Sequence, residues 1–71
     1  MRLFASLRKW MPDDPGDHEV EGQKTIGEFL GEVGVPRDAV AIIMRNGKRA
    51  GPDSLLAEGD ILEVFPLIGG G

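Results

Sequence analysis

The sequence predicts an α+β fold in which one main helix packs across a small mixed sheet. Three observations lead to this prediction. A helix with marked ends lies between short apolar strands, an Asn-Gly dipeptide signals a hairpin, and no repeat or long linker divides the chain. With 71 residues, the chain has room for one domain, and so small a domain buries only about 60% of its unfolded surface.

The helix is predicted over residues 25–33 because both of its ends are marked. Thr25 is followed three residues later by Glu28, which is a capping box. Gly34 stands where a left-handed C-cap is needed, and Pro36 prevents continuation. The apolar positions recur at helical spacing and predict one buried face, made of Ile26, Phe29, Leu30 and Val33.

Gly27 and Gly31 interrupt the predicted helix. Each destabilises a helix by roughly 1 kcal/mol relative to alanine. They stand four residues apart on the helix flank. Close approach to a partner would explain them, and simple tolerance is the favoured interpretation.

Short strands are expected on both sides of the helix. Before it, residues 2–5 form a strand that continues over 6–11 as strand or helix, and a weak strand over 18–22 returns as a hairpin. After it, residues 40–45 form an apolar strand, and Asn46-Gly47 predicts a two-residue turn into a short return strand over 48–50.

The last strand is expected over residues 60–66, paired in parallel with the first strand at the centre of the sheet. Its residues alternate, and we expect Leu62 and Val64 to face the core. Ile61 and Phe65 then lie on a more exposed face with Glu63 between them. An exposed apolar cluster of this kind marks a partner surface unless a loop or an edge covers it.

The composition excludes several classes of function. The chain has no cysteine and one histidine, His18, so zinc–thiolate sites, iron–sulfur clusters, disulfides and cysteine nucleophiles are ruled out. We interpret His18 as exposed and predict no metal and no bound cofactor. The formal net charge of −4 argues against a nucleic-acid partner. No apolar run approaches the roughly 20 residues of a membrane span, so we expect no membrane contact and a cytoplasmic protein.

The sequence does not indicate an independent enzyme. Ser6 and Ser54 lack a nucleophile motif, and the paired Asp13 and Asp14 lie in a turn-forming segment without the burial that acid–base catalysis needs. The glycines at the chain end are not a phosphate-binding loop, because no helix and no Lys-Ser/Thr pair follows them.

Basic side chains gather on the predicted hairpin, at Arg45, Lys48 and Arg49. Across a two-residue turn Arg45 and Lys48 should stand opposite each other, where like charges are mildly unfavourable. A docking site for an acidic partner would explain the cluster, and a solvated hairpin tip is the simpler explanation.

The chain ends in Leu67, Ile68 and three glycines, Gly69 to Gly71. Glycines cannot pack a core, and a frayed terminus is one explanation for them. The functional explanation is that a backbone without Cβ can enter a narrow channel and present the carboxylate of Gly71. A carboxylate is a poor electrophile, so ATP in a partner enzyme must first convert it to an adenylate. A sulfur nucleophile then displaces AMP and leaves a thiocarboxylate on Gly71.

Several short segments along the chain form an ordered set: Arg2-Leu3-Phe4-Ala5-Ser6-Leu7-Arg8, Thr25-Ile26, Val40-Ala41-Ile42-Ile43 with Asn46-Gly47, Glu58-Gly59-Asp60, and Val64-Phe65-Pro66 before the glycines. Together they resemble the MoaD/ThiS family, which includes the small subunit of molybdopterin synthase and the thiamine sulfur carrier. The resemblance runs nearly end to end. It implies a ubiquitin-like β-grasp domain over residues 1–66 and a flexible C-terminal tail over residues 67–71.

The resemblance also implies a function. A ubiquitin-activating-type adenylyltransferase would use ATP to adenylate the terminal glycine, and Gly70 and Gly71 match the family's terminal pair. The sulfur acceptor would be the large subunit of molybdopterin synthase or thiazole synthase, so the chain is expected to be a carrier and co-substrate rather than an enzyme. The residues expected to contact partners are Ile61, Phe65, Pro66, Leu67, Ile68 and Gly69.

Several alternatives stay open. Phe65-Pro66 and the start of the chain resemble the molybdopterin branch, whereas Gly69 to Gly71 after Ile68 resemble the thiamine branch. The chain could also be a ubiquitin-like modifier joined to lysines through the same carboxylate, which would produce isopeptide adducts. A β-grasp binding module with an idle tail would be unaffected by deletion of Gly70 and Gly71.

Overall fold

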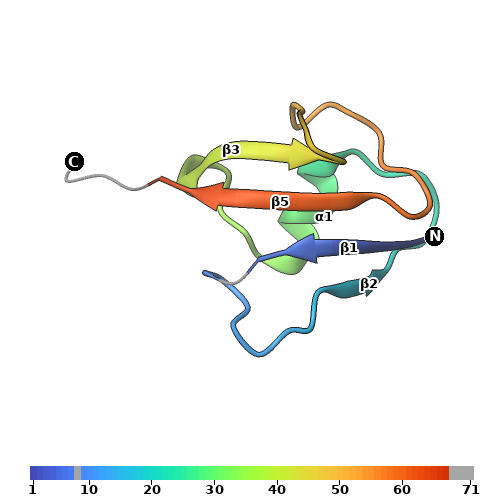
Figure 1. The fold of residues 1–71 in the computed structure, drawn as a ribbon, viewed down its shortest axis with the longest axis horizontal. Coiled ribbons are helices and arrows are strands. Elements are labelled where there is room, and N and C mark those ends of the chain that lie inside the picture. Colours follow the sequence, from blue (N-terminus) through green and yellow to red (C-terminus); the bar gives the residue numbers. More distant parts are fainter. Residues whose placement is uncertain (8, 68–71) are drawn as a thin grey trace.

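The computed structural model describes residues 1–7 and 9–67, which form a five-stranded mixed sheet with one helix across one face (Figure 1). The sheet order is β2-β1-β5-β3-β4. This is the expected α+β class and the β-grasp arrangement. The elements are β1 (Arg2–Ser6), β2 (Asp17–Glu19), α1 (Ile26–Val33), the short 3-10 helix η1 (Arg37–Ala39), β3 (Val40–Arg45), β4 (Lys48–Arg49) and β5 (Ile61–Pro66).

The first and last strands pair in parallel at the centre of the sheet, as predicted. Phe4 lies opposite Ile61 and Ser6 opposite Glu63. On the outer sides, β2 pairs antiparallel with β1, and β3 pairs antiparallel with β5. Residues distant in the sequence are therefore joined by backbone hydrogen bonds, and the start of β1 lies beside the start of β5 (Figure 1).

The region before the helix differs from its prediction. β2 covers residues 17–19 rather than 18–22, and the amide of the next residue, Val20, donates to the carbonyl of Met1. β1 ends at Ser6. The amides of Trp10 and Met11 both donate to the carbonyl of Leu7, which is a turn and neither a longer strand nor a helix.

The helix agrees with its prediction at both ends. The side chain of Thr25 accepts from the amide of Glu28 at 3.1 Å, and Oε1 of Glu28 accepts from the amide of Thr25 at 2.9 Å. The backbone donor of Thr25 is the main cause that lowers the pKa of Glu28. The capping contribution is therefore complete above the ordinary carboxyl pKa and is lost as the pH falls through the lowered value. Gly34 closes the helix with a φ of +89°.

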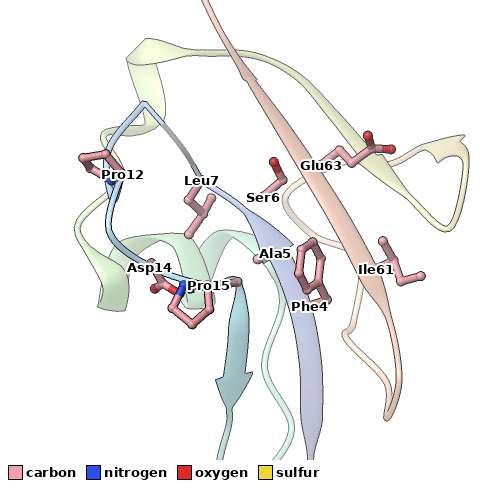
Figure 2. Close-up of a pocket in the computed structure, with 10 residues that line it drawn as sticks. Phe4, Ala5, Ser6, Leu7, Pro12, Asp14, Pro15, Ile61 and Glu63 are labelled. Atoms are coloured by element: carbon pink, nitrogen blue, oxygen red, sulfur yellow. Dashed lines mark hydrogen bonds between the residues drawn. The ribbon is translucent and has the colours of Figure 1, made fainter.

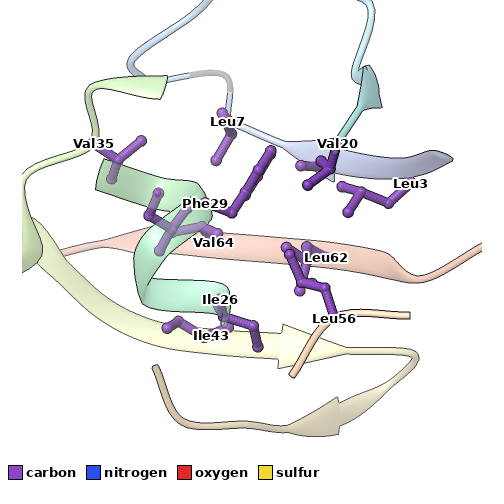
Figure 3. Close-up of a cluster of buried hydrophobic side chains, with 12 residues drawn as sticks. Leu3, Leu7, Val20, Ile26, Phe29, Val35, Ile43, Leu56, Leu62 and Val64 are labelled. Carbon is purple, nitrogen blue, oxygen red and sulfur yellow. The ribbon is translucent and has the colours of Figure 1, made fainter. Parts of the chain in front are cut away.

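The core lies between the helix and one face of the sheet (Figure 3). Leu62 and Val64 face it with 0% and 7% exposure, which confirms the predicted orientation of β5. Ile26 and Leu30 of α1 are also fully buried. The remaining buried side chains are Leu3, Ala5, Leu7, Val20, Phe29, Val35, Ile43 and Leu56. In the described part of the chain, no helix is long and apolar enough to cross a membrane.

A polar network that the sequence did not reveal fixes the hairpin against β5. Asn46 and Gly47 have φ of +53° and +83°, as a tight two-residue hairpin turn requires. Asp60 is 4% exposed, and its carboxylate accepts from Nδ2 of Asn46 at 3.0 Å and from the amide of Ala57 at 2.8 Å. Nε of Arg45 lies 3.0 Å from the same carboxylate, so a buried charge is compensated.

Candidate functional site

The outer face of the sheet, opposite the helix, carries large apolar side chains that remain exposed. Phe4, Ile42, Ile61 and Phe65 each keep between 38% and 52% of their surface accessible. They lie on β1, β3 and β5, beside residues that fill the core: Leu3, Ala5, Ile43, Leu62 and Val64. We call these four residues the outer apolar face.

Strand register groups the outer apolar face into two pairs. Phe4 lies directly opposite Ile61, and Ile42 lies opposite Phe65. Glu63 is exposed between them on β5, opposite Ser6 on one side and Met44 on the other. The face thus presents two apolar patches with a carboxylate between them. A partner surface with apolar side chains around a basic group would complement it.

A groove of about 700 Å³ adjoins the first pair (Figure 2). Phe4, Ser6, Ile61 and Glu63 form one wall, and the loop with Pro12 and Pro15 forms the other (Figure 2). The groove is apolar over the phenylalanine and prolines and acidic at its rim. It extends the outer apolar face toward the loop that joins β1 to β2.

Three contacts shape this loop. Gly16 has a φ of +105°, and a Cβ there would lie 2.5 Å from the ring of Phe4, so only glycine lets the chain pass beneath the ring. Oδ1 of Asp14 accepts from the amide of Gly16 at 2.7 Å, and Oδ2 lies 3.3 Å from Nε2 of His18.

The expectation that His18 is exposed is wrong. Only 12% of its side chain is accessible, because the ring packs edge-on against Phe29 at a centroid distance of 5.2 Å. The hairpin turns this side chain toward the helix. In residues 1–7 and 9–67, no three metal-ligating side chains come together.

The structure places some of the predicted site residues and leaves others outside its described range. Ile61 and Phe65 lie on one exposed face, as predicted, and no loop of the described chain covers them. Pro66 ends β5 opposite Val40 and is partly buried, and Leu67 is exposed. Ile68, Gly69, Gly70 and Gly71 lie outside the described residues.

Phe4 and Ile42 were missed as members of this face. The signal for Phe4 was present, because it alternates with Leu3 and Ala5, which both fill the core. Alternation along β3 groups Ile42 with Met44, but both faces of this strand are largely apolar, so the pattern does not say which set faces the core.

Comparison with known proteins identifies the family. The family model described as Mut7-C ubiquitin matches residues 1–69. The chain belongs to the Mut7-C ubiquitin family. Two solved structures share the fold of this Mut7-C ubiquitin domain. The thiamine biosynthesis protein ThiS from Geobacter metallireducens matches over 100% of both chains, with 22% identity and a TM-score of 0.69. SAMP1 from Haloferax volcanii matches over 99% of this chain and 97% of its own, with 23% identity and a TM-score of 0.61.

No curated protein matches the chain. The family match and the shared fold confirm the resemblance to ubiquitin-like proteins of the MoaD/ThiS type that the ordered sequence segments indicated. The ThiS-like fold extends over the whole chain.

Proposed function

We propose that this Mut7-C ubiquitin domain is a sulfur carrier whose working group is the carboxylate of Gly71. The observation that carries the proposal is the geometry of β5. This strand presents Ile61 and Phe65 on the outer apolar face, ends at Pro66, and leads through the exposed Leu67 into the glycines. One strand thus supplies both a docking surface and the segment that would enter a partner.

The proposed reaction has two steps. An oxygen of the Gly71 carboxylate attacks the α-phosphorus of ATP in an activating enzyme, which forms the acyl adenylate and releases pyrophosphate. Sulfide, or another sulfur nucleophile, then attacks the acyl carbon, and AMP leaves with the electron pair of the broken C–O bond. The product is a thiocarboxylate on Gly71. In this proposal the chain is a co-substrate, and the partner enzyme supplies the catalytic groups.

The outer apolar face is proposed to bind the activating enzyme while the tail occupies its nucleotide site. Side chains half exposed in the free protein are suited to this, because their remaining apolar surface is buried only on docking. Beyond the described residues, Ile68, Gly69 and Gly70 form the proposed link that threads toward the nucleotide.

We propose a cofactor precursor as the final sulfur acceptor, in the cytoplasm, held by the large subunit of molybdopterin synthase or by thiazole synthase. Reconstitution with each acceptor enzyme in turn separates the two pathways. Conjugation to lysines is the competing use of the same adenylate, and it would yield isopeptide-linked adducts rather than a free thiocarboxylate.

The test is the intact mass of the full chain after incubation with a ubiquitin-activating-type enzyme, ATP and sulfide. We expect the mass gain of one oxygen replaced by sulfur. Oxidised methionine gives nearly the same gain, so fragmentation must localise it to Gly71.

A chain lacking Gly70 and Gly71 is the matched control and should gain no mass. If the full chain gains none, with an enzyme shown to act on another carrier, the sulfur-carrier proposal is wrong. The binding-module interpretation then stands.

A further inference from the structure

A second groove lies on the opposite side of β3 from β5. Its volume is about 220 Å³. Its floor is aliphatic and its two charged lining residues are arginines, Arg37 and Arg49. The lining consists of Leu30, Arg37, Val40, Ala41, Ile42, Ile43, Arg49, Ala50 and Pro52. We call it the edge groove.

The edge groove follows a part of β3 that has no strand beside it on this side within residues 1–7 and 9–67. β4 has only two residues, and it pairs with Met44 and Arg45. One further bond joins the amide of Ala50 to the carbonyl of Ile43 at 3.0 Å. Residues 40–42 therefore form an open sheet edge, which is a template for pairing with another extended segment.

The register shift in β3 bears on this edge. The pairing with β5 jumps from Val40 to Ile42, so Ala41 is the extra residue of a bulge. The extra residue of a bulge is left unpaired in the ladder. At Ala41 and Ile42, the backbone groups of the open edge thus lie next to exposed aliphatic side chains.

The charge of the edge groove contrasts with that of the whole chain. The formal net charge is −4, yet both charged residues of the groove are cationic. The ion pairs of the described chain are His18–Asp14, Lys24–Glu32 and Arg45–Asp60, so neither Arg37 nor Arg49 takes part in one there. Guanidinium groups bind carboxylates with paired hydrogen bonds, so the complement of this groove is acidic.

We propose that the edge groove binds an extended segment of a partner protein in which acidic residues flank a short aliphatic stretch. The segment lies along residues 40–42 as an added strand. Its aliphatic side chains contact the groove floor, and its carboxylates meet Arg37 and Arg49. This interaction surface shares Ile42 with the outer apolar face, but it does not depend on the tail.

Strand spacing gives a first choice of test peptide, with one acidic residue directed toward Arg37 and the other toward Arg49. Arg37 precedes the start of β3, and Arg49 lies opposite Met44. From Val40 to Met44 is four strand steps, or roughly 13 Å. Residues i and i+4 of an extended peptide are about this far apart and point to the same side. The peptide Glu-Val-Ile-Val-Glu places its two acidic residues at this spacing and has a short aliphatic stretch between them.

The same features have another explanation. Bulges and charged side chains protect sheet edges from self-association. If that explanation holds, the arginines repel other copies of the chain. Replacing Arg37 and Arg49 by glutamate should then leave peptide affinity unchanged and alter the oligomeric state.

The experiment measures fluorescence anisotropy of labelled Glu-Val-Ile-Val-Glu with the full chain, and amide shifts by NMR. We expect binding with shifts concentrated at residues 41–43 and at Ala50. The double variant Arg37→Glu/Arg49→Glu should raise Kd by about tenfold or more. Lys9→Glu/Lys48→Glu is the matched control, since both lysines are exposed, lie outside the groove and change the net charge equally.

Three further results decide the proposal. The peptides Lys-Val-Ile-Val-Lys and Glu-Val-Pro-Val-Glu should not bind, because the first reverses the charge and the second removes a strand hydrogen bond. Equal weakening by the lysine control would show that only net charge matters, which overturns the proposal. Shifts confined to Phe4, Ile61 and Phe65 would overturn it too, as would a dimer of the unmodified chain whose interface is this edge.

Discussion

At the scale of single residues, Asp60 shows how one carboxylate fixes a local structure. It is nearly inaccessible, yet three groups approach it: Arg45 at the end of β3, Asn46 in the hairpin turn, and Ala57 in the turn before β5. Asn46 also accepts a hydrogen bond from β5, since its Oδ1 lies 2.9 Å from the amide of Ile61. The start of β5 is therefore held against the hairpin turn, and this sets the position of Ile61 on the outer face.

Replacing Asp60 should be strongly destabilising. Asp60→Ala leaves the amide of Ala57 and the side chain of Asn46 without their acceptor, and we expect a loss of about 2–4 kcal/mol of unfolding free energy. Asp60→Asn keeps one acceptor oxygen and should lose less. Urea denaturation measures both. Asp53→Ala, at an exposed carboxylate, is the control and should change stability by less than about 0.5 kcal/mol. Similar results for Asp53→Ala and Asp60→Ala would contradict the role of the network.

At the scale of elements, the two glycines of α1 have different explanations. The amide of Gly27 donates to the carbonyl of Pro52 at 2.8 Å, and a Cβ at Gly27 would lie 3.2 Å from that same carbonyl oxygen. A Cβ at Gly31 would meet nothing within 4 Å. Tolerance, the favoured interpretation of the sequence, holds for Gly31. Gly27 allows a close approach, and the segment that approaches is Pro52 of the same chain.

This difference predicts opposite outcomes for the same substitution. Gly31→Ala should stabilise the protein by about 0.5–1 kcal/mol, since alanine loses less backbone entropy in a helix. Gly27→Ala should gain less or become destabilising, because Pro52 would have to shift. Thermal and urea unfolding of the two variants provide the measurement, and each serves as the other's control. Equal stabilisation by both would show that the contact with Pro52 has no energetic consequence.

At the scale of the whole molecule, the two sides of the sheet differ in what they expose. The inner side and α1 bury the core, whereas the outer side leaves two apolar pairs exposed around Glu63. The tail starts from the end of β5, next to the second pair. A partner that covers the outer apolar face would therefore lie beside Leu67, where the tail begins.

Substitutions in the outer apolar face should leave the domain folded but slow its adenylation by the activating enzyme. In Ile61→Thr/Phe65→Thr both side chains are half exposed, so we expect a loss of less than about 2 kcal/mol of stability. If the proposed function holds, pyrophosphate release by the activating enzyme at limiting carrier should fall by about tenfold or more. Leu55→Thr removes an equally exposed leucine that lies beside Thr25, away from this face, and should leave the rate unchanged. Full activity of the double variant would exclude this face as the docking surface.

Local patterns were sufficient to predict the helix, its caps, the Asn46-Gly47 turn and the orientation of β5. These depend on contacts within a few residues or on a simple alternation, and both can be recognised in the chain itself. The parallel pairing of β1 and β5 was a topological hypothesis that the sequence itself does not show, and the structure confirms it. The same alternation would have placed Phe4 on the outer face.

Only the tertiary structure decided the features that depend on distant segments. The burial of His18 depends on a hairpin turning it against Phe29, and the network of Asp60 joins turns that are separate in the sequence. The register shift in β3 lies along the edge groove, and no local sequence pattern predicts it. Residue spacing predicts an element because it repeats along the chain, whereas a site built across strands is determined by register, and register exists only once the strands have paired.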